Sequence, residues 1–289
     1  MTRNKAALFR HLLAGQRLVR LAGAHSGISA RLVQRSGFDA IWASGLEIST
    51  SYGVPDAGIL TMSELLESAR IMNETVALPI IADCDTGFGE TRNVEHMVHR
   101  YEAAGIAGVC IEDKQFPKLN SFADGDQELA PIKPFQAKIR AAKDAQATRD
   151  FLVIARIEAF IAGRGLDEAL TRAHAYADAG ADAILIHSKQ RSSDEVFGFA
   201  RAWKARLPLV VVPTTYFRTQ VEDFEEVAIK AVIYANHAMR AAVRAMTETL
   251  AAIHTSGSTE CVEHRIAPVS ELFDLQGMDH VLERPDVAA

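Results

Sequence analysis

The sequence has few cysteines, no concentrated basic segment and no long apolar run. Cys84, Cys110 and Cys261 are odd in number and form no CxxC pair, so neither a disulfide framework nor a cysteine zinc site is supported. The formal net charge is −6, and without clustered Lys and Arg we expect no nucleic-acid partner. No run of eighteen apolar residues predicts a membrane span, and "MTRNKAALFRHLL" lacks the features of a signal peptide. These absences predict a cytoplasmic protein that does not bind membranes.

What the sequence does have is a high apolar content, 48% of 289 residues, arranged in a repeated pattern. The segments "RSGFDAIWASG", "AAGIAGVCIED" and "DAGADAILIHS" each pass from a helical pattern through Gly into a short apolar run. Similar runs are "RLVRLAGAH", "LPIIADCDTG", "FLVIARIEA", "PLVVVPTT" and "AVIYANH". Eight strands alternating with helices predict a single α/β domain over residues 1–289, a (β/α)8 TIM-type barrel. A doubly wound sheet is the alternative, but "AGAHSG" lacks its glycine-rich fingerprint.

Polar residues follow most of the predicted strands, where a barrel of this type carries its active site. They are Trp42, Ser44 and Gly45; Asp83 and Asp85; Glu112 and Asp113; Arg156 and Glu158; His187 and Ser188; and Asn236. Because side chains alternate along a strand, Asp83 and Asp85 should face the barrel mouth while Cys84 faces the helices.

The acids at these strand ends predict a metal site. Asp83, Asp85 and Glu112, with Asp56 from "GVPDAG", would bring mutually repelling carboxylates to one mouth. A hard cation such as Mg²⁺, held directly by one or two carboxylates and through water by the rest, would resolve the repulsion. The alternative is that these acids cap helices or pair with Arg and Lys.

The basic residues at the strand ends leave two interpretations open. Arg156 lies in an otherwise apolar strand, where an unpaired guanidinium is costly. Its anion is either Glu158 or a bound carboxylate or phosphate, both of which Arg grips well. His187 is either a neutral core histidine or a hydrogen-bond donor to a substrate oxygen. Backbone N–H groups in "WASGLE" are a further candidate for holding an anionic oxygen.

The segment "KQFPKLNSFADGDQEL" follows the fourth predicted strand and is too long for a simple turn. We interpret the loop of about residues 114–130 as a lid over the barrel mouth. The alternative is a mobile surface loop without a gating role.

Five segments together carry a resemblance to a known family: "DCDTGFG", "EDKQFPKLNSF", "ARIEAFIAG", "GADAILIHSK" and "VPTTYFRT...YANHAMRAA". Over roughly residues 15–280 the chain resembles the isocitrate lyase and phosphoenolpyruvate mutase superfamily. The resemblance implies a (β/α)8 barrel whose last helix is exchanged between subunits of a homo-oligomer, either dimer or tetramer. It also implies binding of Mg²⁺, with Mn²⁺ as an alternative, and of small α-keto or enol acids. The amphipathic C-terminal extension, about residues 241–289, would support the subunit contact.

The resemblance also implies a role for each matching residue. Asp83 would bind the metal directly, with Asp85, Glu112 and Asp56 holding it through water. Arg156 and His187 would contact a transferring phosphoryl group. Lys118 and Asn120 would act from the closing loop, and the remaining implied substrate contacts are Trp42, Ser44, Gly45, Leu46, Ser121 and Ser188.

The implied activity is the interconversion of phosphoenolpyruvate and phosphonopyruvate, the carbon–phosphorus bond-forming step that begins phosphonate biosynthesis. Mutases of the family carry Asn at the position of Asn120, whereas its phosphonopyruvate hydrolases carry Thr. Hydrolysis of phosphonopyruvate to pyruvate and phosphate is therefore the alternative. Carbon–carbon cleavage of the isocitrate lyase type is disfavoured because loop 114–130 has no cysteine. A non-catalytic barrel that binds an oxyacid is the third hypothesis.

Overall fold

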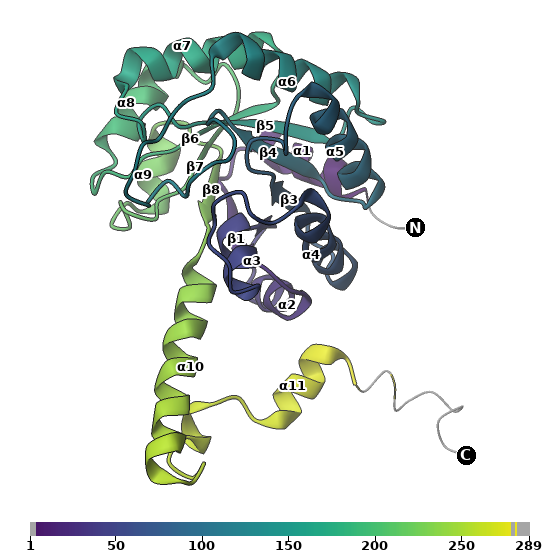
Figure 1. Cartoon of the computed structure of the whole chain (residues 1–289), viewed down its shortest axis with the longest axis vertical. Helices are drawn as coiled ribbons and strands as arrows, with labels where there is room; N and C mark the ends of the chain where they lie inside the picture. The colour runs from purple at the N-terminus through teal and green to yellow at the C-terminus, as the bar shows by residue number, and fades with distance from the viewer. Residues whose placement is uncertain (1–3, 279–280, 282–289) are drawn as a thin grey trace. The chain divides into compact units, whose positions relative to one another are not determined.

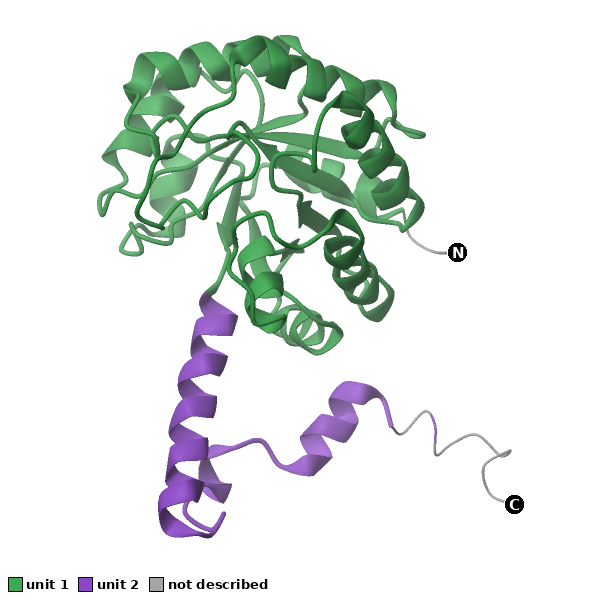
Figure 2. Ribbon diagram, viewed as in Figure 1, with its two compact units in different colours: residues 1–236 green, residues 237–289 purple. Residues whose placement is uncertain are grey.

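The computed structural model describes residues 4–278 and residue 281, and the chain divides into two compact units, residues 1–236 and 237–289 (Figure 2). In the first unit eight parallel strands pair in sequence order and close when β8 pairs with β1. The predicted (β/α)8 barrel is confirmed, and the doubly wound alternative is wrong. The strands are β1 Val19–Ala24, β2 Ala40–Ala43, β3 Ile80–Asp83, β4 Gly108–Glu112, β5 Leu152–Ile157, β6 Ala183–Ile186, β7 Leu209–Val211 and β8 Ala231–Tyr234.

Helices surround the strands of this unit (Figure 1). Several begin at side-chain caps, such as Ser26 before α2 and the Thr61–Glu64 capping box before α4, which satisfy free backbone N–H groups. The helices of the first unit are α1 Lys5–Ala14, α2 Gly27–Arg35, α3 Gly45–Ser51, α4 Met62–Thr75, α5 Thr91–Ala103, α6 Ile132–Asp144, α7 Gly165–Asp178, α8 Asp194–Trp203 and α9 Val221–Glu226.

Two apolar clusters hold the barrel together, one inside the sheet and one between the sheet and the helices. Strand residues alternate between them: Leu152 and Ile154 belong to the inner cluster, and Val153 and Ala155 to the outer one. Phe9 of α1 is also buried in the inner cluster. The interior is therefore packed with side chains below the level of the strand ends, as in other barrels of this type.

The second unit consists of α10 His237–Ser256, a short 3₁₀ helix Glu263–Arg265 and α11 Val269–Gln276. Apolar side chains of α10 and α11 lie at its surface, including Met246, Leu250 and Phe273. The sequence predicts a single barrel domain with an extension from about residue 241. That division of the chain into domains stays a prediction. Across the described residues, the helices are too short or too polar to span a bilayer.

Candidate active site

Strand side chains alternate between the barrel interior and the helices, and this alternation also directs the polar side chains at the strand ends into the barrel mouth. On β5, Arg156 is the next inward residue after Leu152 and Ile154. On β3, Asp83 follows Ile81, and on β6 His187 follows Leu185 in the same way. Cys84 belongs to the outer cluster, which confirms that it faces the helices.

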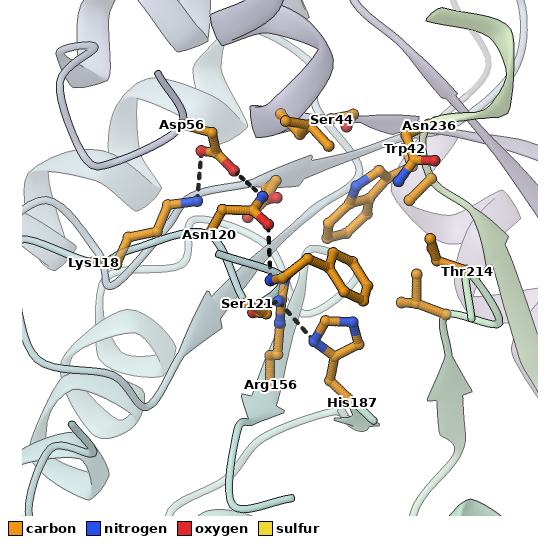
Figure 3. Close-up of a pocket in the computed structure, with 15 residues that line it drawn as sticks. Trp42, Ser44, Asp56, Lys118, Asn120, Ser121, Arg156, His187, Thr214 and Asn236 are labelled. Atoms are coloured by element: carbon orange, nitrogen blue, oxygen red, sulfur yellow. Dashed lines mark hydrogen bonds and ion pairs between the residues drawn. The ribbon is translucent and has the colours of Figure 1, made fainter. Parts of the chain in front are cut away.

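A cavity of about 40 Å³ lies at these strand ends (Figure 3). Phe122, Val212, Thr214, Ala235 and Asn236 contribute to its wall beside most of the predicted site residues. The predicted residues that line it are Trp42, Ser44, Leu46, Asp56, Asp83, Lys118, Asn120, Ser121, Arg156 and His187.

Gly45, Asp85 and Glu112 are buried beside the cavity without lining it. A Cβ atom at Gly45 would lie 3.2 Å from Asp83 Oδ2, so glycine permits the first turn of α3 to approach that carboxylate. The N–H groups of Gly45 and Leu46 form no backbone hydrogen bond within the described chain, because they open this helix. Asp85 has φ of 48°, a left-handed conformation that few non-glycine residues adopt.

Ser188 is also absent from the cavity wall. It is fully buried, and its hydroxyl donates a hydrogen bond to Glu195 Oε2 at 2.5 Å. The structure therefore gives no support to a substrate contact by Ser188, and that assignment stays a prediction.

The predicted lid loop, which joins β4 to α6, lies against the mouth. Lys118 Nζ donates to Asp56 Oδ1 and Asn120 Nδ2 donates to Asp56 Oδ2, both at 2.7 Å. Burial opposes ionisation of Asp56, but Lys118 and Asn120 outweigh it and lower the pKa of this carboxyl. The base of the loop is closed by backbone hydrogen bonds, including Gln115 N to Glu128 O at 3.0 Å.

Ser121 of the predicted lid contacts Glu158 and Arg156 of the barrel and Lys114 at the start of the same loop. Its hydroxyl donates to Glu158 Oε2 at 2.6 Å, and it accepts from Lys114 Nζ and from an Arg156 guanidinium nitrogen, both at 2.9 Å. Lys114 Nζ also donates to Leu119 O at 2.8 Å. Ser121 thus holds this loop against Glu158 and Arg156 of the barrel mouth.

Arg156, Glu158 and His187 contact one another under the predicted lid. Arg156 Nε donates to Glu158 Oε1 at 2.6 Å, so the internal ion pair that the sequence left open is present. His187 Nδ1 lies 2.8 Å from Glu158 Oε1 and 3.0 Å from an Arg156 guanidinium nitrogen. Burial opposes ionisation of Glu158, yet Arg156 and His187 hold the pKa of this carboxyl well below its ordinary value. Burial, followed by Arg156, lowers the pKa of His187, so its ring is neutral near pH 7.

The acids near the mouth have the chemistry of a cation site. Burial is the main cause that raises the pKa of the Asp83 carboxyl to about 6. This carboxylate makes no hydrogen bond or ion pair in the described part of the chain. Glu112 Oε2 lies 3.2 Å from Arg156 Nε, whereas its buried Oε1 has no hydrogen-bond partner and lies 4.0 Å from Lys114 Nζ. The described side chains do not form a ready cluster of three or more His, Cys, Asp or Glu ligands. Two incompletely satisfied carboxylates fit a hard cation that takes few direct protein ligands and keeps several waters.

Sequence reasoning missed several residues of this site. Lys114 stands in the segment "EDK", and the end of a predicted strand was a signal for Thr214. Asn236 was predicted to lie at the end of its strand but was given no role. Phe122 contacts His187 edge-on, with 5.5 Å between ring centroids. An aromatic residue in a lid has no distinctive sequence pattern, so this contact required the fold.

Comparison with known proteins identifies the family of this chain. Residues 9–254 match the family described as phosphoenolpyruvate phosphomutase. The chain belongs to the phosphoenolpyruvate phosphomutase family. It is 48% identical to the phosphonopyruvate hydrolase of Variovorax sp. (strain Pal2), over 96% of this chain and 96% of that protein.

Two solved structures of this family superpose closely on the chain. Phosphoenolpyruvate phosphomutase from Streptomyces platensis subsp. rosaceus is 55% identical, with a TM-score of 0.95 over 96% of this chain and 97% of that one. A phosphonopyruvate hydrolase in complex with oxalate and Mg²⁺ is 46% identical, with a TM-score of 0.91 over 97% of each chain. This member of the phosphoenolpyruvate phosphomutase family is therefore similar both to a protein named as a mutase and to proteins named as hydrolases.

Proposed function

We propose that this protein is a phosphoenolpyruvate mutase, which moves a phosphoryl group within one molecule between C3 and the C2 oxygen of the pyruvyl unit. The observation that carries the proposal is Asn120, which lines the cavity and donates to Asp56 at 2.7 Å. Asn120 Oδ1 also accepts from Phe122 N at 3.0 Å, so both ends of this amide are engaged in the closed lid. The threonine expected in a hydrolase has a shorter side chain with one hydroxyl, which would have to make both contacts from a single atom.

The transfer needs positioning and charge neutralisation more than a protein nucleophile. Phosphoryl transfer generally passes through a loose transition state with charge spread over the phosphoryl oxygens. In the proposed mechanism Arg156 and His187 hold these oxygens, and the N–H groups of Gly45 and Leu46 hold the carboxylate end. Glu158 orients Arg156 and His187 through contacts of 2.6 and 2.8 Å. Breaking the C3–P bond and forming the O–P bond within this frame leaves both ends bound.

We further propose Mg²⁺ as the cofactor, held directly by Asp83 and through water by Asp56, Asp85 and Glu112. The unpartnered Asp83 carboxylate and the unsatisfied Glu112 Oε1 support this assignment. When bound, Mg²⁺ would stabilise negative charge on the keto oxygen. Mn²⁺ takes similar oxygen ligands and is the alternative.

The lid would keep water away from the phosphoryl group during transfer. The cavity of about 40 Å³ has room for roughly two or three waters, so a substrate can enter only if the lid moves. The contacts of Lys118 and Asn120 with Asp56, and of Ser121 with Glu158, would break and reform in each cycle. We expect a poorly closed lid to admit water and convert the mutase into a hydrolase.

Hydrolysis of phosphonopyruvate is the second candidate function, because the hydrolase of Variovorax is 48% identical to this chain. ³¹P NMR of the protein with phosphonopyruvate and Mg²⁺ separates the two reactions, with EDTA as the metal-free control. A phosphoenolpyruvate signal that grows without inorganic phosphate supports the mutase. Phosphate as the direct product contradicts it, and an Asn120→Thr variant should move the products toward phosphate.

We also propose that the protein is a homo-oligomer that assembles through residues 237–289. Met246 is 54% exposed and Leu250 66% exposed on α10, and Val269 is 63% exposed on α11. Such apolar surface is typical of a subunit contact. Sedimentation of a monomer at micromolar concentration would contradict this proposal.

A further inference from the structure

Two polar side chains on the cavity wall have no hydrogen-bond partner. Asn236, two residues after the end of β8, is 6% exposed, and its Oδ1 is shielded from solvent without a donor in the described part of the chain. Thr214, after β7, has a hydroxyl oxygen that is equally shielded and unpaired. Both residues line the cavity. Because a buried polar group without a partner is costly, such a pair beside a cavity indicates a missing ligand.

The surroundings of this pair differ from the rest of the wall. Its neighbours on the wall include Trp42, Val212 and Ala235, which carry no charge. Figure 3 shows Thr214 and Asn236 across the cavity from Asp56 and Lys118. The polar groups on that other side already hydrogen-bond to one another. Apart from the Asp83 carboxylate, which is assigned to the metal, the unpaired buried side-chain oxygens of the described wall are Thr214 Oγ1 and Asn236 Oδ1.

We propose that Thr214 and Asn236 form an uncharged subsite that donates hydrogen bonds to oxyanion oxygens of the substrate, an inference that rests on the proposed function. A hydroxyl and a carboxamide N–H can each donate to a carboxylate or phosphonate oxygen. No hydrogen bond fixes the Asn236 amide in the described structure, so it can turn its Nδ2 toward an anion. The pair adds directional contacts without adding charge to a site that already contains Lys118 and Arg156.

Thr215 provides a matched control. Its hydroxyl is also shielded and unpaired, but it is not among the residues that line the cavity. Thr214→Val and Thr215→Val therefore make the same chemical change one residue apart. Replacing an unpaired hydroxyl by a methyl should leave the stability of the free protein equal or higher in both variants. Only the change at Thr214 should weaken ligand binding.

The experiment is calorimetric titration of wild type, Thr214→Val, Asn236→Leu and Thr215→Val with oxalate plus Mg²⁺, and separately with inorganic phosphate. Loss of one hydrogen bond to an anion should weaken binding about tenfold. A loss for oxalate alone places a carboxylate at the subsite, and a loss for phosphate alone places the phosphoryl group there. Thermal melts of the free proteins show whether each variant is folded; should Asn236→Leu misfold, Thr214→Val alone decides.

Three results would overturn the subsite. These are unchanged affinity of Thr214→Val and Asn236→Leu for both probes, an equal loss in Thr215→Val, or a wild type that binds neither probe. A different result would exclude the proposed function while leaving the subsite intact. Wild type that binds the probes with the expected losses in the variants, yet releases phosphate from phosphonopyruvate, would retain the subsite and exclude the mutase.

Discussion

Replacing Asp83 by asparagine should stabilise the metal-free protein while removing its activity. The Asp83 carboxylate is buried, forms no hydrogen bond or ion pair within the described chain, and has its pKa raised by that burial from 3.8 to about 6. A group whose folded-state pKa is raised in this way opposes folding once it ionises. The carboxamide that Asp83→Asn introduces is uncharged at every pH, so the variant escapes this cost.

The size and the pH window of the effect follow from the two pKa values. Below about pH 4 the Asp83 carboxyl is protonated in both the folded and unfolded states, and it carries no penalty. Above about pH 6 the penalty is constant, and the change in pKa corresponds to ~3 kcal/mol. At pH 5 we expect roughly half of this difference between the variant and wild type. The gain at pH 7.5 should raise the Tm by roughly 6–12 °C for a unit of this size.

The assay is thermal and urea unfolding in EDTA at pH 5.0 and 7.5, with Asp144→Asn as a control on the exposed surface of α6. Added Mg²⁺ should then stabilise wild type but not Asp83→Asn, because ligand binding to the folded state raises stability. An Asp83→Asn variant that is less stable than wild type at pH 7.5 in EDTA would refute the reasoning. Equal stabilisation of both proteins by Mg²⁺ would refute Asp83 as the direct ligand.

Three further predictions concern the groups around the lid. Lys118→Met should leave the buried acids Asp56 and Asp85 without their shared cation, lowering the free energy of unfolding by roughly 3–5 kcal/mol in denaturant titrations; unchanged stability would contradict this. Glu158→Gln should lower kcat at least tenfold in a folded protein, because Arg156 and His187 lose their common anion; steady-state kinetics with a circular dichroism control measures it. Ser121→Ala should raise the proportion of phosphate in ³¹P NMR product analysis, because the loop loses its hydrogen bonds to Glu158 and Lys114. An unchanged proportion would mean that Ser121 does not hold the lid closed.

The strands were predictable because each is a short apolar run between turn signals, and side-chain alternation then placed their ends. The same rule that put Asp83 inside and Cys84 outside also places His187 inside and Ser188 outside. Ser188 was nevertheless assigned to the substrate, although it donates to Glu195 of α8. Applied consistently, the alternation would have removed Ser188 from the site.

The lid contacts could not be predicted from local sequence because they connect distant segments. Ser121 meets residues 35 and 37 positions later in the chain, and Lys118 meets Asp56, 62 positions earlier. Loop residues carry no periodicity that would orient their side chains before the fold is known. Their chemistry was visible in the sequence, whereas their partners were set by barrel closure.

Under the proposed function, Asp56 would link lid closure to the charge of the proposed metal site. In the closed lid Lys118 lies 2.7 Å from Asp56 Oδ1 and 3.0 Å from Asp85 Oδ1, and it is one of the cations that lower the pKa of Asp83. Opening the proposed lid would withdraw this cation and leave three acids facing one another, which costs free energy unless another positive charge takes its place. A divalent cation would supply that charge, so metal binding should make lid opening easier and allow substrate to enter. Closure would then return Lys118 to Asp56 and exclude water, so in this proposal cofactor binding affects the choice between transfer and hydrolysis.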